Sequence, residues 1–141
     1  MNESAAETRS VIVEREFPFP PEKLWRALTQ PHLIEEWLMQ GDFKPAVGHR
    51  FNFRRSPKPD VNIVVDCEVL EIEPNKVLAY SWAAYGLESV VTWTLTRTDV
   101  GTRLRMEQSG FRADQKQAWH GARHGWQQSF ANLENVLART D

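Results

Sequence analysis

The sequence lacks several features that would assign it to a functional class. It has one cysteine, Cys67, in 141 residues, which excludes an internal disulfide and any zinc site built from paired cysteines. No apolar run approaches the roughly 20 residues that span a bilayer. Residues Met1–Thr8 are polar and acidic, without the basic start and apolar stretch of a targeting segment. We therefore expect a cytoplasmic protein that does not act on membranes.

The charges and glycines exclude further classes. The 17 basic and 19 acidic residues give a net charge of −2 and form no basic stripe, so we expect no nucleic-acid partner. The seven glycines are scattered and make no phosphate-binding loop. No Ser-His-Asp or Cys-His arrangement is readable. We expect no catalytic residue, no metal and no cofactor.

The strongest positive signal is a C-terminal amphipathic helix, predicted over residues 115–138 with Asp114 as its N-cap. Its apolar residues recur at helical spacing and form one narrow stripe: Trp119, Ala122, Trp126, Phe130, Leu133 and Leu137. Aromatic rings of this size stabilise a fold by being buried. The preceding elements read as strands, so the stripe is expected to pack on an antiparallel sheet.

The rest of the chain predicts an α+β fold. Alternating apolar residues indicate a first strand near 11–16 and later strands near 49–54, 61–72, 78–82, 89–96 and 102–107. The 61–72 strand has apolar residues on both parities, which indicates a bulge or a partly covered second face. Two short helices are expected after the first strand, at about 21–28 and 32–38. We predict a disordered tail (residues 1–9) and a single domain (residues 10–141) with about six strands.

Several stretches resemble one known family, in order along the chain. They are Phe19–Thr29 followed by Pro31 and Trp37, Glu68–Pro74 with Leu78–Trp82, Val91–Leu95, Ser109–Phe111, and His124–Trp126 with Leu133 and Leu137. These stretches are similar to the activator-of-heat-shock-protein-90-ATPase-like family of the START-like (helix-grip, SRPBCC) superfamily. The resemblance implies a curved antiparallel sheet wrapped around the long C-terminal helix, and members that bind varied ligands or partners.

Large side chains on the inward parity form the candidate site. They either fill the core or wall a ligand pocket, and the sequence leaves both interpretations open: Trp37, Phe51, Phe53, Trp82, Trp93, Met106, Trp119, Trp126 and Phe130. Trp37 and the second short helix would form a lid. Gln108 and Arg54 are the polar groups expected near one end of the cavity.

Other chemical candidates have a simpler interpretation. His120 and His124 have the i, i+4 spacing of metal ligands, but they are expected to face solvent and lack a third ligand. Glu68 and Glu107 could form an acid–base pair, but their strand parity places both on the outer face. Gly121 and Gly125 weaken a helix interior, so we expect a close approach or a kink beside the pocket mouth.

These observations favour non-enzymatic binding of a small hydrophobic or aromatic molecule between the C-terminal helix and the sheet. One alternative is a cyclase- or hydrolase-like enzyme that uses the same cavity, which needs a buried titratable group. Another is a protein-interaction module of co-chaperone type, implied by the resemblance, which needs an exposed apolar patch. A homodimer is compatible with the sequence.

Overall fold

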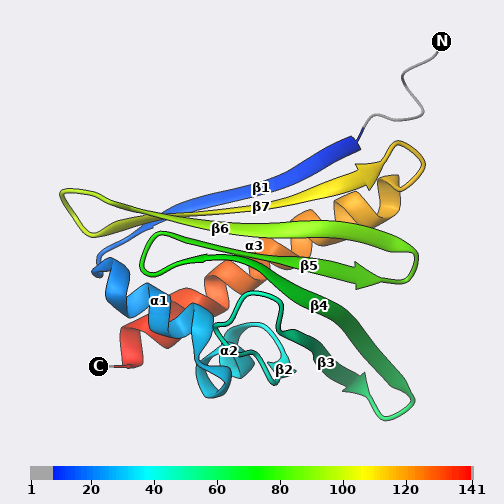
Figure 1. Ribbon diagram of the computed structural model, residues 1–141, viewed down its shortest axis with the longest axis horizontal. Coiled ribbons are helices and arrows are strands. Elements are labelled where there is room, and N and C mark those ends of the chain that lie inside the picture. Colours follow the sequence, from blue (N-terminus) through cyan, green and yellow to red (C-terminus); the bar gives the residue numbers. More distant parts are fainter. Residues whose placement is uncertain (1–7, 141) are drawn as a thin grey trace.

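The computed structural model describes residues 8–140 and has the predicted α+β architecture. A curved, open antiparallel sheet of seven strands covers one long C-terminal helix, and two short helices lie near the C-terminal end of that helix (Figure 1). Residues 1–7 of the predicted disordered tail lie outside the described residues. The first strand starts at Thr8, within the range assigned to that tail.

The elements follow the expected order. They are β1 (Thr8–Phe17), α1 (Pro21–Thr29), α2 (Pro31–Trp37), β2 (Gln40–Gly41), β3 (Arg50–Lys58), β4 (Val61–Glu73), β5 (Val77–Ala84), β6 (Leu87–Arg97), β7 (Thr102–Arg112) and α3 (Lys116–Arg139). The strand order in the sheet is β1-β7-β6-β5-β4-β3-β2. Strand β2 was not predicted, because two residues carry no readable periodicity.

Prolines set the starts of the two short helices. Pro21 and Pro31 each occupy the first helical turn, where the fixed φ of proline suits the helix and its missing N–H loses no bond. The indole Nε1–H of Trp37 donates to the carbonyl oxygen of Ala27 at 2.9 Å. This bond joins the end of α2 to α1 and holds both helices against the core.

The irregularity predicted in the long strand is a bulge. In the pairing of β4 with β5, Val69 lies opposite Tyr80 but Glu71 lies opposite Ala79, so the register shifts around Leu70. The extra residue points outward, and Leu70 is an exposed apolar side chain. The bulge explains the change of parity at Leu70 and Ile72, whereas Val64, which precedes it, is an exposed apolar residue on the outer face.

The two halves of α3 have different surroundings. The buried residues of its apolar stripe belong mainly to the C-terminal half: Trp126, Phe130, Leu133, Val136 and Leu137. Trp119 and Ala122, in the N-terminal half, are only partly buried. The expected N-cap is wrong: Gln115 occupies that position without a side-chain cap bond. The Asp114 carboxylate instead accepts a hydrogen bond from Arg112 Nε at 3.2 Å.

The core centres on Trp93, which is fully buried in the middle of the sheet. Its ring lies 5.5 Å from Trp37, 5.6 Å from Trp126 and 5.8 Å from Phe130, centroid to centroid. These are the separations of favourable aromatic pairs. Its indole N–H donates to the Tyr80 hydroxyl at 2.9 Å. The centre of the protein is therefore a solid aromatic cluster.

Over residues 8–140, no helix is both long enough and apolar enough to cross a bilayer.

Candidate functional site

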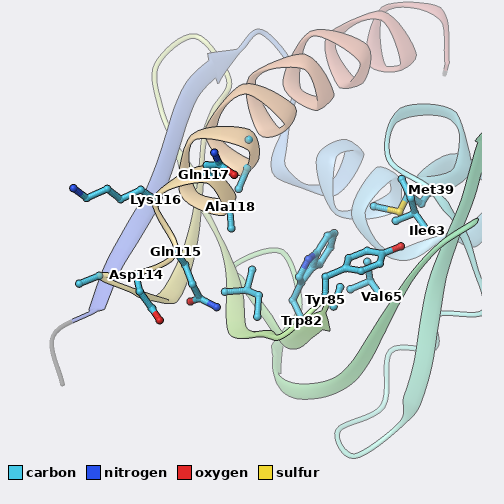
Figure 2. A pocket seen from close by; sticks show the side chains of 15 residues that line it. Met39, Ile63, Val65, Trp82, Tyr85, Asp114, Gln115, Lys116, Gln117 and Ala118 are labelled. Atoms are coloured by element: carbon cyan, nitrogen blue, oxygen red, sulfur yellow. The ribbon is translucent and has the colours of Figure 1, made fainter. Parts of the chain in front are cut away.

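A groove opens where the N-terminal half of α3 stands away from the sheet. Its outer part has a volume of about 980 Å³, comparable to small-molecule sites. The sheet side is formed by Ile63, Val65 and Trp82, and the helix side by Ala118, Gly121 and Ala122. Figure 2 shows Trp82 and Tyr85 across the open space from Gln115 to Ala118. We call this space the outer groove.

A smaller cavity of about 190 Å³ continues from the outer groove towards the core. Both are lined by Met39, Trp82, Leu87 and Ala122, so they form one continuous site. The deeper part, here called the inner groove, adds residues from the segment after α2, from β3 and β7, and from α3: Leu38, Arg55, Gln108, Gly125, Trp126 and Ser129. The site is thus largely apolar with a few polar groups.

Tyr85 is placed at the mouth of the groove by a tight turn. Tyr85 and Gly86 connect β5 to β6, and both have the positive φ values of a two-residue hairpin turn. The Tyr85 hydroxyl donates to the Asn62 carbonyl at 3.0 Å. Gln115 Nε2 donates to the Gly86 carbonyl at 3.2 Å. These bonds tie the turn to β4 and to the start of α3.

The backbone of this turn is left-handed at both positions, with φ of 51° at Tyr85 and 80° at Gly86. Glycine adopts such a φ freely, whereas for tyrosine it is uncommon. The bond from Tyr85 to Asn62 holds the ring in place despite this conformation. Sequence reasoning missed this turn, because tyrosine is not a residue typical of the first turn position.

Gly121 and Gly125 contribute to the width of the groove. A Cβ atom placed on either residue would meet nothing within 4 Å, so the expected close approach of another segment is wrong. Instead, Gly121 lines the outer groove and Gly125 lines the inner groove. The missing side chains leave open space that a larger residue would occupy. This space explains why glycine, which weakens a helix, occurs at these two positions.

A chain of buried hydrogen bonds supports the inner groove. Gln108, which is 1% exposed, accepts from Trp126 Nε1 at 2.7 Å and donates to Ser89 Oγ at 3.0 Å. Ser89 Oγ donates in turn to the Trp82 carbonyl at 2.9 Å. Gln108 therefore lies near the cavity, as the sequence predicted, and it fixes the positions of both tryptophans that line the cavity.

Trp82 carries a free hydrogen-bond donor. Its side chain is 91% buried, since only 9% is exposed, yet within residues 8–140 its indole N–H has no partner. No fully buried side-chain nitrogen or oxygen of the described residues lacks a partner. The Trp82 N–H must therefore be reachable from outside, and the accessible space beside this residue is the groove.

The arginine that lines the inner groove is Arg55, whereas the sequence analysis selected Arg54. Along β3, Phe51 and Phe53 point into the core, and Arg55 continues the same parity opposite Ile63 of β4. Arg54 has the other parity and does not line the groove; it lines a surface hollow that Arg55 and Ile63 also border. Strand alternation alone could have identified Arg55.

The structure separates the predicted pocket residues into two sets. Trp82 and Trp126 line the groove. The others pack in the core away from the groove lining: Trp37, Phe51, Phe53, Trp93, Met106 and Phe130. The residues that sequence reasoning missed are mainly small or aliphatic, and neither kind carries a distinctive signal.

Trp37 and Trp119 differ from their predicted roles for separate reasons. Trp37 is 2% exposed and bonded to α1, so it does not form a lid; Leu38 and Met39, which follow it, reach the groove instead. Trp119 donates its indole N–H to the Ser10 carbonyl of β1 at 2.9 Å. This bond turns Trp119 towards the edge of the sheet and away from the groove.

The other chemical candidates do not form a site. His120 and His124 are exposed, as expected. Within residues 8–140, no cluster of three His, Cys, Asp or Glu side chains could hold a metal ion. Glu68 and Glu107 lie on β4 and β7, with β5 and β6 between them, and pair with Arg50 and Arg105 respectively. They are not an acid–base pair.

Two groups have strongly shifted pKa values, and both lie in the core. Burial, reinforced by the nearby Asp66 carboxylate, raises the pKa of the Cys67 thiol to about 12. Burial also raises the pKa of the Tyr80 hydroxyl, an effect only partly opposed by its hydrogen bond with Trp93. Both shifts keep the neutral form. Neither residue lines the groove.

Comparison with known proteins agrees with this architecture. The family model described as Activator of Hsp90 ATPase homolog 1-like protein matches residues 18–138. The crystal structure of protein MLL2253 from Mesorhizobium loti is 62% identical, with a TM-score of 0.87 over 94% of this chain and 99% of that one. A comparison with curated proteins finds no match.

More distant structures share the fold. CalU16 from Micromonospora echinospora is 24% identical, with a TM-score of 0.76 over 94% of this chain and 78% of that one. DynU16, from the dynemicin biosynthetic locus, is 23% identical, with a TM-score of 0.80 over 92% of this chain and 47% of that one. At these identities the likeness concerns the fold alone.

Proposed function

We propose that this chain, which belongs to the Activator of Hsp90 ATPase homolog 1-like family of the START-like superfamily, binds a small hydrophobic or aromatic molecule without transforming it. The bound molecule would lie in the groove between α3 and the sheet. The observation that carries the proposal is the groove itself, which runs from an open mouth to the buried edges of Trp82 and Trp126.

The character of the walls supports this function. Trp82, Leu87 and Ile63 offer apolar surface on the sheet side, while α3 presents glycine and alanine. Burying apolar ligand surface against such walls is favourable by roughly 25 cal/mol per Å². The hydrogen-bonded chain through Gln108 keeps the inner wall in place without a ligand, so little ordering is needed on binding.

Two features favour binding over the alternatives. Among the described residues that line the groove there is neither a histidine nor a cysteine, and the two groups with raised pKa values lie elsewhere in the core. The exposed large apolar side chains are spread over β1, the two ends of β4, and loops and turns: Ile12, Val61 and Val64, Leu70, and Val47, Tyr85 and Val100. This scatter does not resemble a protein-docking patch.

The test is titration with octanamide, a neutral molecule with an apolar chain, followed by calorimetry and thermal unfolding. Binding should be saturable and should raise stability by about 2.7 kcal/mol at a hundredfold excess over Kd. It should also carry a negative heat-capacity change, the mark of apolar burial.

A groove-filling variant and a matched control make this test specific. Gly125→Leu places a side chain in the inner groove and should abolish binding without unfolding the protein, because leucine is the better helix former. Gln127→Leu adds a leucine at an exposed position that does not line the groove and should bind like the parent. Equal binding by the parent and Gly125→Leu would exclude the groove as the site.

A further inference from the structure

The polar groups left free in the inner groove are mainly donors. Gln108 has its oxygen and its amide nitrogen engaged by Trp126 and Ser89. The indole N–H of Trp82 is unpartnered, and the Arg55 guanidinium makes no ion pair or hydrogen bond within residues 8–140. Only the Ser129 hydroxyl, which also lines this space, can either donate or accept. A ligand that fits here must supply acceptors.

The sign of the charge in the groove is positive. Lys116 and Asp114 also line the outer groove, but the Asp114 carboxylate is paired with Arg112 at 3.2 Å. Lys116 extends from the outer rim away from Trp82 (Figure 2). The first turn of α3, which borders the mouth, contains no acidic residue, so its positive dipole end is not neutralised. Among the described residues, Arg55 is the cation that lines the inner groove.

We infer that the groove selects anionic amphipathic molecules, with Arg55 and the Trp82 N–H binding a carboxylate whose apolar tail lies along the groove. This inference rests on the proposed function and specifies its ligand class. A guanidinium offers several N–H donors in a fork that matches a carboxylate. Apolar walls beside the fork strengthen the attraction, because they lower the local dielectric constant.

The experiment compares octanoate with octanamide, two probes of similar shape that differ in charge. Isothermal titration calorimetry at low salt should show octanoate binding roughly two- to fivefold more tightly, the range of one exposed charge pair. The preference should shrink as salt is added, because salt screens an exposed pair.

Three arginine variants locate the effect. Arg55→Gln should remove the preference for octanoate, weakening octanoate binding more than octanamide binding, while Arg55→Lys should retain most of the preference. Arg54→Gln removes the same charge from the neighbouring residue, which does not line the inner groove, and should keep the preference. Trp82→Phe should weaken the binding of octanoate and of octanamide equally, because the amide oxygen of octanamide also accepts a hydrogen bond from the Trp82 N–H.

The outcomes separate this inference from the proposed function. If octanamide binds but octanoate is not preferred, or if Arg55→Gln leaves the preference intact, the assignment of Arg55 is wrong and the binding function stands. If neither probe binds at saturating concentration, the proposed function fails and this inference fails with it.

Discussion

At the scale of single residues, the absence of a side chain is as informative as its presence. Gly121 and Gly125 lie in the interior of a helix, where each costs about 1 kcal/mol relative to alanine. Both line the groove and have no neighbour within 4 Å of a Cβ position. The chain therefore gives up some helix stability at the two positions where a side chain would narrow the site.

We predict that Gly121→Ala and Gly125→Ala each raise the free energy of unfolding by about 0.5–1 kcal/mol. Thermal or denaturant unfolding would measure the gain. Affinity for octanamide should fall in the same variants, since the new methyl groups occupy groove volume. A loss of stability would mean that these glycines serve a backbone need that the structure does not show.

Cys67 provides a second prediction at this scale, concerning alkaline pH. Its pKa is raised from 9.0 to about 12 in the folded state, so above pH 9 the unfolded chain loses this proton while the folded chain keeps it. The folded state then binds more protons, and the free energy of unfolding must fall as pH rises from about 9 to about 12. Tyr80 acts in the same direction, starting from its ordinary pKa of 10.0.

Denaturant unfolding at a series of alkaline pH values would measure this fall. Cys67→Ala removes the thiol contribution, so the free energy of unfolding of this variant should decline less steeply with pH than that of the parent. At neutral pH the variant should be less stable than the parent, because packing is lost. Parallel declines in the two proteins would contradict the assignment.

At the scale of elements, α3 has two roles along its length. Its C-terminal half packs in the core against β1 and the two short helices, and its N-terminal half forms one wall of the groove. The change occurs near Trp126, which contacts both Trp93 in the core and Trp82 at the groove. Stability and binding should therefore respond to different parts of the same helix.

Leu133→Ala tests this division. Leu133 is fully buried, so its truncation should cost about 2–5 kcal/mol, which denaturant unfolding would report. Octanamide affinity, measured where the variant is still folded, should stay close to the parent value, because Leu133 does not line the groove. An unchanged unfolding midpoint would mean that packing of the C-terminal half of α3 does not stabilise the core.

At the scale of the whole molecule, residue pattern predicted the architecture but not the site. Strand alternation and helix periodicity report which side chains point inward, and this was enough for the α+β fold and for the burial of α3. They do not report how far a helix stands from a sheet. The aromatic residues were therefore expected to wall a pocket, whereas Trp93 and Phe130 fill the core.

The groove arises from properties that no single stretch encodes. It depends on the curvature of the sheet, on the small residues of α3 and on the turn that carries Tyr85. Arg55 is an exception, because it continues the parity of Phe51 and Phe53 and could have been found. The sequence analysis did not select Arg55, because an arginine is ordinarily expected to face solvent whatever its strand parity.

The ion pairs of the molecule predict a weak response to salt. The eight pairs found in residues 8–140 all involve side chains that are at least 33% exposed. Exposed pairs contribute little and are screened. We expect the free energy of unfolding to change by less than about 1 kcal/mol between low and high salt, measured by urea denaturation. A larger loss would indicate a cooperative charge network.

The position of β1 in the sheet has a consequence for synthesis of the chain. Within residues 8–140 this strand pairs only with β7, and its Thr8 lies opposite Arg112. At ribosomal rates the first strand therefore waits about 5–20 s for its partner to be made, and α3 emerges later still. During that interval the apolar side of β1 is uncovered on the nascent chain, so early binding by a chaperone would protect this segment more than any other strand.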